Sequence, residues 1–241
     1  MMLFKPYRFI FFQFLFLIVL FTGCQSENEV NFNSNSESEP TAISYLALGD
    51  SYTIGTGISE ENNYPNQLSE SLIPNDFTVS ELEIIAVNGW TTTDLKVGIE
   101  QEKPDSTFDL VSLLIGVNNQ YQGLDIELYQ NEFRELLEQS IAFAQGDTRR
   151  VFVLSIPNYG VTPFAQSRDT AAIRQEIAIY NEIAENISAE YDIPFIDITP
   201  ISELAADDTD LLASDNLHPS AEMYGLWVEE MLPTIKQILN E

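Results

Sequence analysis

A serine, the chain's single histidine and an aspartate are the residue types that together perform nucleophilic catalysis. Ser51 ends a Gly-Asp-Ser motif after an apolar run, and Asp215 lies three residues before His218 in one loop. A serine hydroxyl is a weak nucleophile until a base takes its proton, and the base needs an acidic partner on its other nitrogen. The three residues therefore suit the roles of nucleophile (Ser51), base (His218) and orienting acid (Asp215).

Three amide groups could stabilise the negatively charged oxygen that such an attack creates. They are the Ser51 backbone amide, the Gly89 backbone amide and the Asn118 side-chain amide, each just after a predicted strand. Removing one preorganised donor of this kind costs about 10²–10³-fold in rate. We therefore expect Ser51, Gly89 and Asn118 to form an oxyanion hole.

Each motif taken alone has a simpler interpretation. An isolated Gly-Asp-Ser is more often a surface turn whose aspartate and serine cap the next helix, and a lone histidine is more often structural. Other chemistries fit less well: the glycines at 55 and 57 lack the rest of a dinucleotide or P-loop motif, and one histidine with one cysteine makes no zinc site. We expect no metal and no cofactor.

The elements that must position these residues follow from the alternation of apolar runs with helical periodicity. That alternation predicts an α/β fold with a parallel sheet, in which the carboxyl ends of the strands carry the chemistry. The predicted strands are 43–48, 82–87, 108–115, 151–154 and 194–198. The predicted helices are 64–72, 91–100, 125–144, 173–191 and 223–239.

In order, these motifs resemble the four blocks of the SGNH hydrolases, also called GDSL esterases and lipases. The blocks are Gly49-Asp50-Ser51, Gly89, Gly116-x-Asn118 and Asp215-x-x-His218-Pro219, spread over about residues 43–239. The resemblance implies a flavodoxin-like three-layer α/β/α sandwich with five parallel strands. It also implies the three catalytic roles given above and cofactor-free hydrolysis of carboxylic esters or thioesters through an acyl-enzyme.

One position departs from the family pattern. Asn119 stands where many members have aspartate. Since that aspartate is not an oxyanion donor, we expect the change to affect local loop structure rather than activity.

The resemblance leaves the substrate open. A lysophospholipase-like or acylhydrolase role fits a membrane-tethered enzyme, and O-deacetylation of a glycan fits an exported one. A catalytically inactive binding lipoprotein of the same fold is the alternative from a different class. Four aromatic residues in loops after strands are candidates for the wall of an acyl or sugar pocket, or for packing: Trp90, Tyr121, Tyr159 and Phe164.

The N-terminus predicts export. Residues 1–23 combine Lys5 and Arg8 with an apolar stretch, as in a signal peptide, and Thr22-Gly23-Cys24 resembles the site at which bacterial lipoproteins are lipidated. A plain signal peptide is the alternative. Residues 24–40 are polar and predict a disordered tether, so 41–241 is the expected hydrolase domain. We expect a lipid-anchored protein of the bacterial cell envelope, on the outer membrane or the periplasmic face.

The charge of the chain excludes one class of partner. It has 38 Asp and Glu against 10 Lys and Arg, a formal net charge of −28. Such a surface repels nucleic-acid phosphates, so we expect a small-molecule, lipid or glycan ester as the binding partner and no nucleic acid.

Overall fold

A five-stranded parallel sheet forms the centre of the described part of the chain. The computed structural model describes residues 39–104 and 107–240, and its strands are arranged in the order β2-β1-β3-β4-β5. All four neighbouring pairs are parallel, as the alternating sequence pattern predicts. The strands are β1 Thr41–Gly49, β2 Phe77–Ala86, β3 Leu110–Leu114, β4 Val151–Leu154 and β5 Phe195–Ile196.

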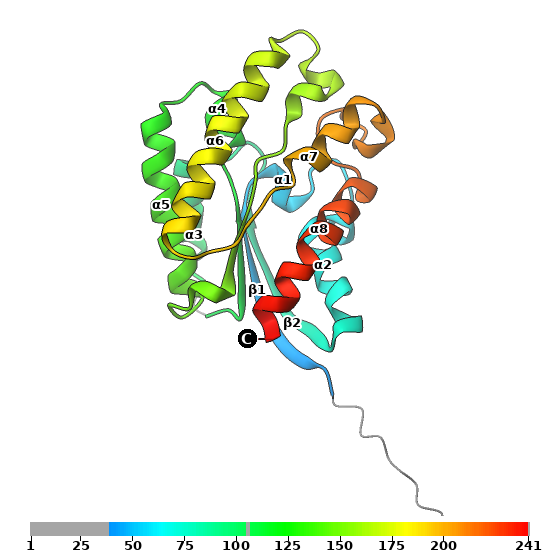
Figure 1. The fold of residues 1–241 in the computed structure, drawn as a ribbon. Coiled ribbons are helices and arrows are strands. Elements are labelled where there is room, and N and C mark those ends of the chain that lie inside the picture. The colour runs from blue at the N-terminus through cyan, green and yellow to red at the C-terminus, as the bar shows by residue number, and fades with distance from the viewer. Residues whose placement is uncertain (1–38, 105–106, 241) are drawn as a thin grey trace, which may run out of the picture. The chain divides into compact units, whose positions relative to one another are not determined.

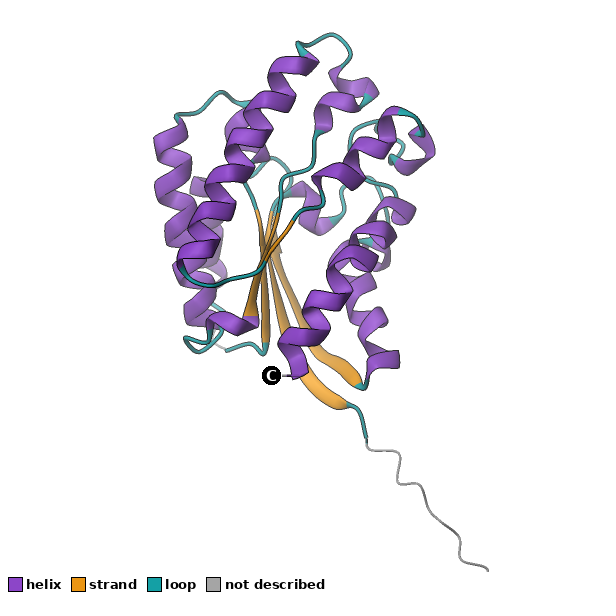
Figure 2. Ribbon diagram, viewed as in Figure 1, coloured by secondary structure: helices purple, strands orange, loops and turns teal. Residues whose placement is uncertain are grey.

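Helices cover both faces of the sheet, which gives the three-layer α/β/α sandwich expected from the sequence (Figures 1 and 2). One layer contains α2 (Tyr64–Leu72) and α8 (Ala221–Asn240), which pack against each other. The opposite layer contains α3 (Thr92–Glu102), α5 (Ile126–Phe143) and α6 (Thr170–Glu190). Because both faces are covered, every residue of β3 and β4 is buried.

Side-chain caps define where several helices begin. The Asn63 side chain accepts from the Asn66 amide at the start of α2, and Asp125 and Asp169 cap α5 and α6 in the same way. Helix α2 ends at Leu72, just before a 3₁₀ turn that contains Pro74. The structure thus confirms α2 at the predicted bounds and the other long helices to within a few residues.

Two strands differ from the sequence prediction. Strand β2 begins at Phe77, five residues earlier than expected. The prediction missed its first half because β2 is an edge strand and this half is polar and partly exposed. Strand β5 is limited to Phe195–Ile196. The structure also adds three short helices, α1 (Ser51–Ile54), α4 (Val117–Tyr121) and α7 (Thr199–Ser202), which lie after the carboxyl ends of strands.

The predicted signal peptide, Cys24 and the tether up to residue 38 lie outside the described residues. Within the described ranges, no helix is both long and apolar enough to span a membrane.

Candidate active site

Ser51 is the first residue of α1, at the carboxyl end of β1. Asp50 caps this short helix: its Oδ1 accepts from the Tyr52 amide at 3.0 Å. Gly49 makes the turn possible, since a Cβ there would lie 2.5 Å from the Leu114 carbonyl oxygen. The Ser51 amide is therefore one of the first-turn N–H groups that the helix itself does not pair.

His218 and Asp215 are bonded within one loop. His218 Nδ1 lies 2.6 Å from Asp215 Oδ2, and Asp215 Oδ1 accepts from the backbone amides of Leu217 and His218 at 3.0 Å each. Burial raises the pKa of Asp215, but the hydrogen bonds from His218 and the backbone outweigh it and leave that pKa below its usual value. An ionised Asp215 bonded to Nδ1 fixes the orientation of the imidazole ring, as a histidine that acts as a base through its other nitrogen requires.

The loop is held in place on both sides of His218. The Ala213 amide donates to the His218 carbonyl at 2.7 Å, and Leu212 pairs with Pro219 in an antiparallel bridge. On the inner side, the Tyr52 ring packs against the imidazole with their centroids 5.2 Å apart. Sequence reasoning did not single out Tyr52, because nothing in the pattern distinguishes it from a core aromatic.

The other two predicted oxyanion donors follow the carboxyl ends of β2 and β3, the two strands on either side of β1. Gly89 follows β2 with φ +86°, and no atom lies within 4 Å of where its Cβ would be, so the left-handed backbone rather than crowding requires glycine. Asn118 lies on α4, and its Nδ2 donates to the Trp90 carbonyl at 2.9 Å and to Asp50 Oδ2 at 3.3 Å.

One cavity of about 250 Å³ brings four of the predicted residues together. Ser51, Gly89, Asn118 and His218 all line it, while Asp215 lies behind the histidine. The other lining residues are mostly apolar or aromatic: Tyr52, Asn88, Val117, Tyr121, Tyr159, Phe164 and Leu217.

Three of the four aromatic residues that were candidates for a pocket wall line this cavity: Tyr121, Tyr159 and Phe164. Trp90 does not: its ring packs against Gly98 of α3, so close that a Cβ on that glycine would collide with it. Of the two roles that the sequence left open for Trp90, the structure therefore shows packing, because the chain turns the indole toward the helix.

Asp50 does more than cap a helix, which is the only role that the sequence suggested. It is 1% exposed and accepts from the Asn118 amide as well as from the Tyr52 backbone. Burial raises the pKa of Asp50 to about 7, although both hydrogen bonds oppose the shift. A carboxyl group that titrates near neutral pH therefore lies between the candidate nucleophile and one candidate oxyanion donor.

A second, more polar cavity of about 350 Å³ lies across Tyr121 and Tyr159, which line both. At its edge the Arg168 guanidinium carbon is 4.3 Å from the Tyr121 ring centroid, and its Nη2 donates to the Tyr121 hydroxyl at 2.7 Å. The polar side chains that line this cavity are Gln120, Gln122, Arg168, Asp169 and Glu176.

Residues 39–104 and 107–240 contain no group of three or more His, Cys, Asp or Glu side chains that could hold a metal ion.

Comparison with protein-family models decides the family. Residues 47–226 match the GDSL-like lipase/acylhydrolase family, which is about three quarters of the chain. The chain belongs to the GDSL-like lipase/acylhydrolase family. A comparison with curated protein sequences finds no significant match.

Solved structures place the GDSL chain among similar folds. The crystal structure of TesA has a TM-score of 0.65 at 15% identity, covering 81% of this chain and 99% of that one. A variant of Axe2, an acetyl xylan esterase from Geobacillus stearothermophilus, scores 0.61 at 20% identity, with coverage of 82% and 97%. The lipase/acylhydrolase from Enterococcus faecalis scores 0.58 at 20% identity, with coverage of 82% and 96%. At these identities the likeness establishes the shared α/β fold.

Proposed function

We propose that this GDSL-family protein is a serine esterase that hydrolyses carboxylic esters through an acyl-enzyme. The observation that carries the proposal is the single cavity lined by Ser51, Gly89, Asn118 and His218, with Asp215 bonded to the far side of the imidazole. Nucleophile, base, orienting acid and oxyanion donors are all present around one space.

In the proposed reaction, His218 Nε2 takes the Ser51 hydroxyl proton as Oγ attacks the ester carbonyl carbon. The carbonyl oxygen becomes an oxyanion held by the amides of Ser51, Gly89 and Asn118. His218 then gives the proton to the departing alcohol. A water molecule, deprotonated by the same nitrogen, attacks the acyl carbon, and His218 returns that proton to Ser51 Oγ as the bond between Oγ and the acyl group breaks and the acid leaves. Asp215 stabilises the imidazolium in both halves of the reaction.

The Asn118 amide is committed to two acceptors before substrate binds. Its bond to the Trp90 carbonyl is 2.9 Å and its bond to Asp50 is 3.3 Å, so the longer, weaker one is the bond that gives way to the oxyanion. Asn118 thereby exchanges a weak hydrogen bond in the ground state for a stronger one to the oxyanion in the transition state, which is where a catalytic interaction lowers the barrier.

The size of the catalytic cavity favours a short acyl group. Its volume of about 250 Å³ is below the roughly 300–1,000 Å³ that is typical of sites for drug-sized ligands. A long fatty acyl chain would have to extend over the rim, where Tyr121 and Phe164 are 41% and 40% exposed.

The polar cavity beyond Tyr121 suits the alcohol part of the substrate. Its amide, carboxylate and guanidinium groups offer both donors and acceptors to a hydroxyl-rich alcohol such as a sugar. We therefore propose a short-chain ester of a polyhydroxylated alcohol, in preference to a lysophospholipid.

A series of p-nitrophenyl esters from acetate to long acyl chains tests the proposal, with Ser51→Ala as the control. We expect turnover to be fastest on the short esters and to be lost in Ser51→Ala. An optimum at long chains would favour a lipid substrate instead. Equal turnover in both proteins would refute the serine mechanism.

The alcohol site has its own test. Arg168→Ala should raise KM for an acetylated oligosaccharide much more than KM for p-nitrophenyl acetate, because only the sugar reaches the polar cavity, although Arg168 also contacts Tyr121, which lines both cavities. Equal effects on the two substrates would contradict this assignment.

A further inference from the structure

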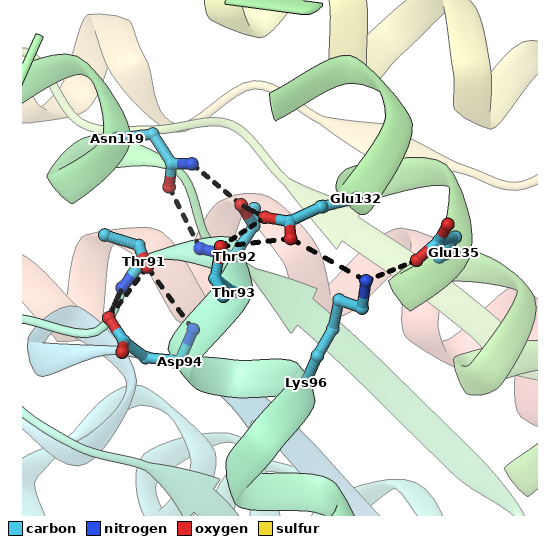
Figure 3. Close-up of polar contacts among 8 residues, drawn as sticks. All are labelled: Thr91, Thr92, Thr93, Asp94, Lys96, Asn119, Glu132 and Glu135. Carbon is cyan, nitrogen blue, oxygen red and sulfur yellow. Dashed lines mark hydrogen bonds and ion pairs between the residues drawn. The ribbon is translucent and has the colours of Figure 1, made fainter. Parts of the chain in front are cut away.

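We propose that Asn119 is a positioning residue that, together with Thr92 and Glu132, holds the loop carrying the Gly89 oxyanion donor. The proposal rests on the esterase function proposed above and adds a group outside the cavity. None of these three residues lines the catalytic cavity, so none can touch the substrate there. Figure 3 shows how they meet between α3, α4 and α5.

Two neighbouring residues of α4 hold the segment that follows Gly89. The Asn118 amide donates to the Trp90 carbonyl at 2.9 Å. Asn119 Oδ1 accepts from the Thr92 backbone amide at 3.0 Å, and its Nδ2 donates to Thr92 Oγ1 at 2.7 Å. Because Asn118 is itself a proposed oxyanion donor, α4 sets the distance between its own donor and the Gly89 donor in the loop after β2.

The hydrogen bonds have only one consistent direction. The Thr92 backbone N–H needs an acceptor, which assigns the oxygen of the Asn119 amide to that side and the NH₂ group to Thr92 Oγ1. The Thr92 hydroxyl proton then points to Glu132 Oε2, 2.6 Å away. The chain of donors therefore runs from Asn119 through Thr92 to Glu132.

Burial makes this direction costly to change. Asn119 and Thr92 are fully buried and Glu132 is 8% exposed. Glu132 also accepts from the Thr93 hydroxyl at 2.8 Å and pairs with Lys96 at 3.7 Å. With these partners the Glu132 carboxylate accepts the hydroxyl proton of Thr92. The Thr92 oxygen then needs a donor, and the side chain at position 119 supplies it.

The fixed direction of these hydrogen bonds accounts for asparagine at a position where many members of the resembled family have aspartate. An aspartate at 119 would still accept from the Thr92 backbone amide. Its second oxygen, however, would compete with Glu132 for the single hydroxyl proton of Thr92, and two buried carboxylates would face each other across one oxygen. In this chain, asparagine at 119 and glutamate at 132 form a matched pair.

The test is a double-mutant cycle of Asn119→Asp and Glu132→Gln in the full chain, assayed on p-nitrophenyl acetate. We expect Asn119→Asp to lower kcat by about 10- to 100-fold with little change in KM, because misplaced catalytic geometry can cost about 10²-fold. Glu132→Gln alone should lower kcat less than Asn119→Asp does, since its amide oxygen can still accept from Thr92 although the charge that pairs with Lys96 is lost. The double variant should recover most of the lost kcat, because the new amide at position 132 can donate to the Thr92 hydroxyl while the new carboxylate at position 119 accepts from it.

Thermal unfolding of the same four proteins gives a second readout that does not depend on activity. Asn119→Asp should lower Tm, and Glu132→Gln should restore it in the double variant. Thr92→Ser, which keeps the hydroxyl, should behave like wild type, whereas the isosteric Thr92→Val should lower kcat.

The outcomes separate the two proposals. An inactive wild type would refute the esterase function, while the Tm cycle would still test the matched pair. An active wild type with unchanged kcat in Asn119→Asp would overturn the positioning role. Loss of kcat and Tm without recovery in the double variant would overturn the matched pair.

Discussion

Asp50 is the residue whose ionisation should make the stability of the fold depend on pH. Burial raises its pKa from 3.8 to about 7 in the folded chain, so the folded protein keeps this proton over a range in which the unfolded chain has lost it. The free energy of unfolding should therefore fall as pH rises from about 4 to about 7. Asp50→Asn, which can still cap α1, should lack this contribution.

The measurement is Tm against pH for the wild type and Asp50→Asn. The many other carboxyl groups affect both proteins alike, so the difference between the two curves isolates Asp50. We expect the wild type to lose more stability than the variant across this range. Parallel curves would mean that Asp50 stays ionised when buried.

Asn118 is the residue whose side chain should stabilise the transition state more than the bound substrate. Asn118→Ala should leave KM for a short ester nearly unchanged and lower kcat by about 10²-fold or more. Steady-state kinetics on p-nitrophenyl acetate measures both constants. An unchanged kcat would remove Asn118 from the oxyanion hole.

At the scale of single elements, α3 determines where the Gly89 loop lies. Gly98, in the middle of this helix, packs against the Trp90 ring and leaves no room for a methyl group. Gly98→Ala would normally stabilise a helix by roughly 1 kcal/mol. Here we expect it to displace Trp90 and, with it, the adjacent Gly89 amide.

The expected result is a lower kcat for Gly98→Ala with a folded protein, measured together with circular dichroism. A solvent-exposed position of the same helix provides the matched control: Val97, which is 46% exposed, should tolerate substitution by alanine. An unchanged kcat in Gly98→Ala would show that displacing Trp90 does not move the Gly89 amide.

How far sequence patterns predict an element depends on its burial. Strand β3 is a nearly continuous apolar run because both of its faces are buried, and helix α2 has apolar residues at helical spacing because one of its faces is buried. The sequence predicts both elements well. The first half of β2 was missed because polar residues such as Thr78, Ser80 and Glu81 at the sheet edge resemble a loop. The spacing of Asp215 and His218 predicts their contact because both lie in one loop.

Contacts between distant segments could not be predicted in this way. The bonds of Asn118 to Asp50 and of Thr92 to Glu132 join residues 68 and 40 positions apart. Both depend on how strands and helices are stacked, and no local pattern marks either pair. The sequence therefore indicates the chemical groups of the site more readily than the residues that hold them in place.

At the scale of the whole molecule, export and anchoring remain a proposal that rests on residues 1–40. If Cys24 is lipidated, the wild type should be recovered in the membrane fraction and released by detergent. Cys24→Ser should be recovered in the soluble fraction with its esterase activity intact. The same distribution for both proteins would contradict lipidation at Cys24.

The acidic surface of the whole molecule also bears on its substrate. With a formal net charge of −28, the chain repels anionic bilayers over about one Debye length, roughly 8 Å at physiological ionic strength. A neutral ester of a sugar meets no such barrier. This agrees with the small catalytic cavity in favouring a hydrophilic substrate over an anionic lipid.

The most direct test of the central claim is to identify the residue that an activated phosphonate ester modifies. Such a reagent is attacked by the nucleophile and leaves a stable adduct that occupies the oxyanion hole. We expect one adduct per chain, mapped by mass spectrometry to the peptide containing Ser51, with loss of hydrolysis in proportion to labelling and much slower labelling in His218→Ala. An adduct on another residue, or full hydrolysis after Ser51 is labelled, would contradict the account.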